Sequence, residues 1–222
     1  MTPTLPTQTR QWQLANRPVG EVHLDGPDPV FKLATVSLPE LETSQVLVKT
    51  LYLSNDAAQR VWITATDDQP RRYLPPIHIG DVMRARSLGE VIESRSEKIP
   101  RGAIVQITGG WTEYTIQPED RCIIAPQASN LPVTQYLGAL GITGLTAYYG
   151  LVEIAKACAA DTVVISGAAG ATGSMAVQVA KNMLGCKKVG KLSQFTSALT
   201  RGTGNWDSRF RRKVRVGAES RR

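Results

Sequence analysis

The stretch DTVVISGAAGATGSMAVQVAKNMLGC, Asp161–Cys186, decides the fold class of this chain. It begins with a continuous run of β-branched residues, which is typical of a strand buried in a parallel sheet. A glycine-rich turn follows, and then a helical segment over residues 171–184. Gly185 stands where a helix of this length ends, and CKKVG starts a second strand. The order strand, helix, strand predicts a βαβ unit.

The helical segment carries its larger apolar residues at intervals of four. Met175, Val179 and Met183 share one predicted face, with Ala176 and Ala180 beside it. We expect that face to pack on the sheet.

The turn SGAAGATG, residues 166–173, resembles the G-x-G-x-x-G fingerprint of dinucleotide-binding proteins. Its marker positions are Ala168, Gly170 and Gly173. Gly170 would let a pyrophosphate approach the backbone, and Gly173 would let the helix pack closely on the strand. The N–H groups at the helix N-terminus would attract the phosphates. The alternative interpretation is a helix start whose small residues serve close packing alone.

The region before this unit has a different pattern. Residues 10–125 contain short strand-like segments separated by Gly and Pro turns, which indicates a compact barrel or sandwich. The strand-like segments are residues 31–38, 44–54, 82–94, 103–117 and 121–126. The polar N-terminus, residues 1–16, is expected to be an arm of loose or edge structure. A helical pattern takes over near residue 131 and carries Leu145, Tyr148 and Tyr149.

The charge of the chain is concentrated in its last segment. Residues 191–222 hold nine Lys or Arg and two Asp or Glu, out of 26 and 19 in the whole chain. The first 190 residues therefore carry 17 of each sign and no net charge. The composition of residues 191–222 predicts a basic, disordered tail. Nucleic-acid binding by this tail is the least favoured interpretation, because a run of basic residues is usually only exposed to solvent.

The sequence lacks the residue clusters that a metal site would need. The three cysteines, Cys122, Cys158 and Cys186, form no CxxC pair, and the two histidines, His23 and His78, are far apart in the sequence. We therefore expect no metal site and no zinc. The cysteine usage, the absence of an 18-residue apolar run and the absence of a leader-like start favour a cytoplasmic protein without a membrane span.

Several segments, in order along the chain, resemble the medium-chain dehydrogenase/reductase superfamily. They are LYLSNDAAQRVWI, YLPPIHIGDVMRARSLGEVIES, GGWTEYTI, GALGITGLTAYYGLVEI and VVISGAAGATGSMAVQVAKNMLGCKKVG. YLSNDAAQR favours its zinc-free branch of NADPH-dependent alkenal/one reductases, the leukotriene B4 dehydrogenase and prostaglandin reductase type. The resemblance implies a mixed α/β fold, with a GroES-like β-barrel over residues 17–128 and a Rossmann NAD(P)-binding unit over residues 129–190.

The resemblance also implies a site and an activity. Tyr52 would hydrogen-bond the substrate carbonyl oxygen, and Asn55, near it, would contact the cofactor. Ile142 and Thr146 would lie beside the nicotinamide. The pyrophosphate would be held by Ala168, Ala169, Gly170, Ala171, Thr172 and Gly173. The implied reaction is NADP(H)-dependent reduction of the C=C bond of an enal or enone, or reduction of a quinone.

The resemblance stops at Gly190, so we expect an incomplete Rossmann unit in a C-terminally truncated family member. Two interpretations stay open. The chain is an NADP-dependent oxidoreductase by family, or it is a non-catalytic dinucleotide-binding or interaction module. An incomplete parallel sheet has an exposed edge, which would suit a homodimer or another partner.

Overall fold

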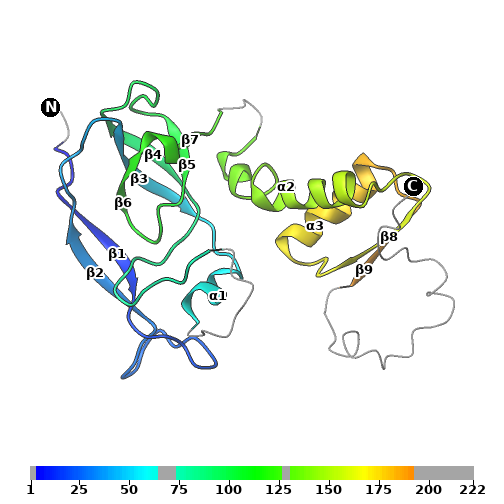
Figure 1. Ribbon diagram of the computed structural model, residues 1–222, viewed down its shortest axis with the longest axis horizontal. Helices are drawn as coiled ribbons and strands as arrows, with labels where there is room; N and C mark the ends of the chain where they lie inside the picture. Colours follow the sequence, from blue (N-terminus) through cyan, green and yellow to red (C-terminus); the bar gives the residue numbers. More distant parts are fainter. Residues whose placement is uncertain (1–3, 65–73, 127–130, 193–222) are drawn as a thin grey trace. The chain divides into compact units, whose positions relative to one another are not determined.

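The computed structural model describes residues 4–64, 74–126 and 131–192. The chain divides into two compact units, Met1–Tyr136 and Leu137–Arg222 (Figure 1). Each unit is described by itself. No helix within the described ranges is long and apolar enough to cross a membrane.

The first unit is built around a five-stranded sheet with the order β6-β3-β4-β5-β7. All of its neighbouring strands are antiparallel. The strands are β3 (Gln45–Leu53), β4 (Ser87–Ser94), β5 (Ile104–Ile107), β6 (Tyr114–Pro118) and β7 (Ile123–Ile124). Each of them falls within or across a segment that the sequence predicts to be extended. The predicted extended segments of this unit are therefore confirmed as strands.

A second sheet and three short helices complete the first unit. β1 (Gln8–Leu14) and β2 (Phe31–Ser37) form an antiparallel pair. The helices are α1 (Gln59–Ile63), η1 (Glu119–Arg121) and η2 (Val133–Leu137), the last of which crosses into the second unit. Single bridges from Gln11 to Thr112 and from Gln13 to Val82 connect β1 to loops of the larger sheet.

Two apolar clusters hold the first unit together, as alternation along its strands predicts. One lies on the five-stranded sheet and contains Val46, Val48, Val91, Ile99, Val105 and Ile107. The other joins β1, β2 and α1 and contains Leu14, Val30, Phe31, Trp62, Ile63, Ile77 and Met83.

The segment expected as an N-terminal arm, residues 1–16, contains β1 and is part of the first unit. Leu14 is fully buried, and Thr9 is 4% exposed. The Thr9 hydroxyl lies 2.9 Å from that of Thr112 and accepts a hydrogen bond from the Tyr114 N–H. Thr9 thus occupies a buried position where an apolar residue is more usual, and hydrogen bonds satisfy its hydroxyl group. For this reason the polar composition of residues 1–16 did not predict a strand.

The second unit contains the predicted βαβ order. Helix α2 (Ile142–Tyr148) continues into the π-type segment η3 (Tyr149–Ile154). It is followed by β8 (Thr162–Ser166), α3 (Ala171–Gln178), the π-type segment η4 (Val179–Met183) and β9 (Lys188–Leu192). β8 and β9 are parallel, with Thr162 opposite Lys188. Figure 1 shows α3 beside this two-stranded sheet, with α2 packed along α3.

The helix faces differ from the sequence prediction. On α3 and η4 the buried residues are Ala176 and Ala180, while Met183 is 57% exposed. On α2 the buried residues are Gly144 and Ala147, while Leu145 is 60% exposed. Close packing selects small residues: a β-carbon at Gly144 would lie 1.8 Å from the Ala139 carbonyl oxygen. Leu145 and Met183 therefore stay exposed, while Met175 is partly buried and packs against the core cluster of this unit.

Two expected boundaries also differ. The units divide after Tyr136, within η2, whereas the resemblance placed the boundary after residue 128. The tail expected over residues 191–222 begins inside β9, where Lys191 is opposite Ile165 and Leu192 is opposite Ser166. Residues 193–222, with the rest of the predicted tail, lie outside the described residues.

Candidate dinucleotide-binding site

The turn between β8 and α3 has a backbone that depends on glycine. Gly167 has φ +61°, a left-handed conformation that glycine adopts without steric cost. Gly170 is extended and caps α3, and its N–H donates to the Gly167 carbonyl oxygen at 2.9 Å. Gly167 is not one of the marker positions of the fingerprint. Its position directly after a predicted strand was the available signal.

Gly173 lets the first turn of α3 approach the end of β8. A β-carbon at this position would lie 2.1 Å from the Gly167 carbonyl oxygen and 2.8 Å from the Ala168 α-carbon. Both separations are far below van der Waals contact, and both atoms belong to the backbone. This geometry supports the packing role expected for Gly173.

The N-terminus of α3 presents free hydrogen-bond donors. Within the described part of the chain, the N–H groups of Ala171, Thr172 and Gly173 have no acceptor, as in the first turn of any helix. Ala169, Gly170 and Ala171 are exposed, and the first turn carries no acidic residue. The helix dipole adds a partial positive charge at this end. The turn is thus open, electropositive and free of competing carboxylates.

Ile142 and Thr146 lie one turn apart on α2, in the same unit. Ile142 is 43% exposed, and Thr146 is exposed and donates its hydroxyl to the Ile142 carbonyl oxygen at 2.6 Å. The second unit therefore holds eight of the predicted site residues, which are these two and the six from Ala168 to Gly173.

Tyr52 and Asn55 belong to the first unit. Tyr52 lies near the end of β3, opposite Leu88 and next to an irregularity in the strand pairing. Its side chain is 46% exposed. Asn55 is exposed in the turn between β3 and α1. Neither side chain makes a hydrogen bond to another described residue, so both are available to a ligand.

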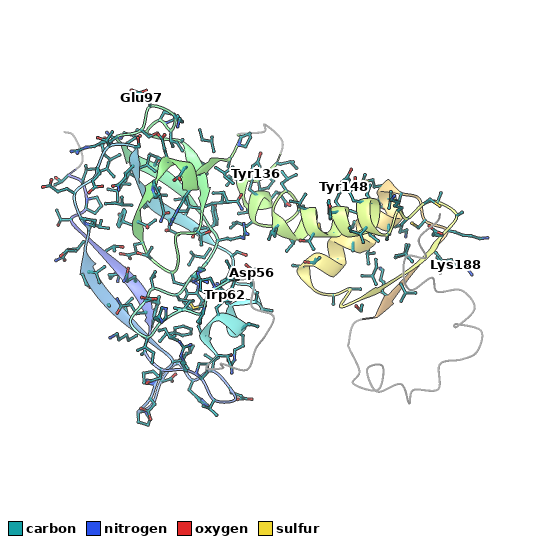
Figure 2. The ribbon with its side chains drawn as sticks, viewed as in Figure 1. Asp56, Trp62, Glu97, Tyr136, Tyr148 and Lys188 are labelled. Atoms are coloured by element: carbon teal, nitrogen blue, oxygen red, sulfur yellow. The ribbon has the colours of Figure 1, made fainter. Side chains whose placement is uncertain are left out.

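Gln59 holds the turn that carries Asn55, a role that the sequence interpretation did not assign. This side chain is 4% exposed. Its amide nitrogen donates to the carbonyl oxygens of Ser54 and Arg84, and its amide oxygen accepts from the Asp56 N–H at 3.1 Å. The Ser54 hydroxyl also donates to Asp56, which is labelled near α1 in Figure 2. In the sequence, this role is indicated only by the position of a glutamine at the start of a short helical segment with apolar residues.

The first unit also contains a cleft of about 600 Å³. Its lining includes Arg84, Gly109, Gly110, Asp120 and Arg121. None of the predicted site residues lines this cleft. Among the described residues no three His, Cys, Asp or Glu side chains are grouped so that they could hold a metal ion.

We predict that Gly173→Ala destabilises the second unit by about 1–3 kcal/mol, because the new methyl group overlaps fixed backbone atoms. The matched control is Gly150→Ala, since a β-carbon there meets nothing within 4 Å. The control should be neutral or stabilising, because alanine favours helix over glycine by about 1 kcal/mol. Hydrogen exchange of the β8 amides measures both effects. Equal exchange rates in the two variants would contradict the close approach.

The first comparison with known proteins concerns the first unit. A family described as the N-terminal domain of oxidoreductase matches residues 10–124, which is just over half of the chain. The match covers β2 to β7 with α1 and η1, and most of β1.

Individual relatives extend the similarity into the second unit. Prostaglandin reductase 1 of Bos taurus is 36% identical over 162 residues, which are 72% of this chain and 46% of that protein. The NADPH-dependent curcumin reductase of Escherichia coli (strain K12) is 34% identical over 184 residues, which are 82% of this chain and 50% of that protein. The chain thus spans about half the length of the curated relatives it matches.

Solved structures give the same family. The crystal structure of CurA in complex with NADPH from Vibrio vulnificus superposes with a TM-score of 0.69 at 31% identity. The match covers 82% of this chain and 51% of that one. The family match, these relatives and the βαβ unit with its glycine turn agree with the sequence motifs. The chain therefore belongs to the medium-chain dehydrogenase/reductase superfamily, in the branch of the prostaglandin and curcumin reductases.

Proposed function

We propose that this chain binds NADP(H) through its second unit and serves in the reduction of an α,β-unsaturated carbonyl compound or a quinone. The observation that carries the proposal is the turn from Gly167 to Gly173, which presents three unpaired N–H groups at the start of α3. The preference for NADP(H) over NAD(H) is supported by relatives: one is named an NADPH-dependent reductase, and another was solved in complex with NADPH.

The turn has the properties that a pyrophosphate group requires. Gly170 adds no side chain between a ligand and the backbone, and the N–H groups of Ala171 to Gly173 can donate to phosphate oxygens. Thr172 is half-buried and adds a hydroxyl group beside these donors. No metal ion is needed for such binding, because the helix N-terminus itself supplies the positive charge.

Residues of both units have roles in the proposed reaction. Ile142 and Thr146 would lie against the nicotinamide, with the Thr146 hydroxyl already directed to the Ile142 carbonyl oxygen. Tyr52 would donate its phenol hydrogen to the substrate carbonyl oxygen and stabilise the negative charge that develops there. Asn55 would sit beside it and orient the reactants. When bound, the cofactor supplies the hydride that is added to the β-carbon of the substrate.

A second candidate function is a dinucleotide-binding or interaction module without catalysis. It is favoured by the sheet of β8 and β9, which has two strands within the described residues and leaves an edge of a parallel sheet exposed. It is also favoured by exposed apolar residues on α2 and η3, namely Leu145, Tyr149 and Ile154. We propose that a second copy of the chain pairs with this sheet edge and also covers these apolar residues. A cytoplasmic location fits the three free cysteines.

Cofactor binding is tested by titrating the chain with NADPH and following cofactor fluorescence. We expect a dissociation constant below about 1 mM, which corresponds to about 4 kcal/mol of binding. Gly170→Asp should weaken binding at least about tenfold, since it places a carboxylate beside the phosphates. Gly150→Asp, with the same charge at an open position of the same unit, should bind as the parent does. If both variants bind equally, the turn is not the phosphate site.

Turnover separates the two candidate functions. An enzyme should oxidise NADPH when an enal, an enone or a quinone is added. Tyr52→Phe should then lower kcat about 100-fold, because it removes the proposed oxyanion donor. Leu51→Ala, which changes the neighbouring exposed residue of β3, is the control and should keep its rate. Cofactor binding without turnover would favour the non-catalytic module.

The interaction surface is tested by the mass of the chain in solution, measured by light scattering during size-exclusion chromatography. We expect a dimer. Tyr149→Lys should convert it to a monomer, since a charge would have to be buried in the apolar contact. Val19→Lys, at a 94% exposed position of the first unit, should leave the dimer intact. A monomeric parent chain would contradict the proposed contact.

A further inference from the structure

Two cysteines of the second unit lie on adjoining turns at the N-terminal ends of β8 and β9. Cys158 is exposed in the turn that leads into β8, and Cys186 is buried in the turn that leads into β9. The two strands are parallel neighbours. Residues that directly precede such strands are therefore brought to the same edge of the sheet, although 27 residues separate them in the sequence.

The two turns lie close to each other. A β-carbon at Gly185 would lie 4.0 Å from the Ala159 side chain. Cys158 directly precedes Ala159, and Cys186 directly follows Gly185. In addition, the Lys188 N–H donates to the Asp161 carbonyl oxygen at 3.4 Å. Each cysteine is thus next in sequence to one of two residues, Ala159 and Gly185, at which the turns approach each other.

The turn that carries Cys158 is well ordered by its own hydrogen bonds. The Cys158 N–H donates to the Asp161 carboxylate at 2.9 Å, and the Asp161 N–H donates to the Cys158 carbonyl oxygen at 3.0 Å. On the other turn, the Cys186 N–H donates to the Ala180 carbonyl oxygen at 2.9 Å. Both turns are therefore held by hydrogen bonds. The proposed bond requires the α-carbons of the two cysteines to lie within about 7 Å of each other.

We propose that Cys158 and Cys186 form a thiol–disulfide modification site whose reaction partner is a low-molecular-weight disulfide. The Cys158 thiolate attacks one sulfur of that disulfide, which releases one thiolate and leaves a mixed disulfide on Cys158. The Cys186 thiolate then attacks the Cys158 sulfur, forms the intramolecular bond and expels the second thiolate. Two protein thiols are oxidised, one small disulfide is reduced to two thiols, and the electrons balance.

The order of attack follows from exposure. Burial raises the pKa of the Cys186 thiol, and Asp161 and Cys158 add to this effect, so a reagent meets a protonated, covered sulfur there. Cys158 is open to solvent and reacts first. Among the described residues, Cys158, Cys186 and Asp161 do not form a group that could hold a metal ion.

The third cysteine provides an internal control. Cys122 lies in the first unit, is half-buried, and donates its thiol hydrogen to the Pro118 carbonyl oxygen at 3.5 Å. Burial raises its pKa to about 11, with Asp120 contributing. Cys122 should therefore stay reduced while the other two react.

The proposal goes beyond the proposed function, and its test uses no nicotinamide cofactor. The full chain is treated with glutathione disulfide, quenched by alkylation and analysed by peptide mass spectrometry. We expect a linked pair of peptides containing Cys158 and Cys186, the loss of two hydrogen masses from the protein, and alkylation at Cys122 only. Cys122→Ser should give the same link.

The two single variants separate this reaction from simple exposure of one thiol. Cys186→Ser should accumulate a stable adduct of one glutathione on Cys158. Cys158→Ser should leave Cys186 reduced after the same treatment. The proposal is overturned if the parent chain accumulates that same stable adduct, or if it forms dimers linked through Cys158 instead of the internal bond.

Discussion

The approach of α3 to the end of β8 is the constraint on which the second unit depends. Gly173 stands so close to Gly167 that no other residue fits without moving backbone, and Gly167 itself has a left-handed conformation. Together the two glycines set where α3 starts and which way its first N–H groups point. The buried alanines of α3 and η4, Ala176 and Ala180, then follow from the same close packing. The packing that fixes the fold and the proposed phosphate-binding surface therefore lie in the same short turn.

The first unit gives the chain a stable platform of a different kind. Its larger sheet packs against an apolar cluster in which Val46, Val48 and Val91 are fully buried. The turn after β3 is held by Gln59, whose side-chain amide forms hydrogen bonds with backbone groups of Ser54, Asp56 and Arg84. Such a network leaves no buried polar group of the glutamine unpaired. Tyr52 and Asn55 are thus presented by a rigid strand end, while their own polar groups remain available.

Local periodicity was enough to predict much of this architecture. The run of β-branched residues, the Gly-rich turn and Gly185 predicted β8, α3 and β9, and short alternating segments predicted the strands of the first unit. What the sequence could not show depends on contacts between distant residues. β1 was missed because the buried Thr9 is satisfied by Thr112, 103 residues away. The face of α3 and η4 was predicted only in part: Ala176 and Ala180 are buried and Met175 packs against them, but Met183 is exposed, because tight contacts favour the small residues.

The candidate site likewise has parts that local sequence patterns predict and parts that depend on distant contacts. The glycine turn was predictable from its position between a strand and a helix, and only the importance of Gly167 was overlooked. The support that Gln59 gives to its turn involves Arg84, 25 residues away, so no local pattern predicts it. The roles of Tyr52 and Thr146 came from resemblance to a family. The structure adds that both residues are exposed, as a ligand contact requires.

Amide chemical shifts of the isotopically labelled chain, recorded as NADPH is added, test the central claim most directly. That claim is that the N-terminus of α3 binds the pyrophosphate through its free N–H groups. The account predicts that the amide signals of Ala171, Thr172 and Gly173 shift most, together with that of Gly170. Saturable shifts confined to other parts of the chain, with these four signals unchanged, would contradict it.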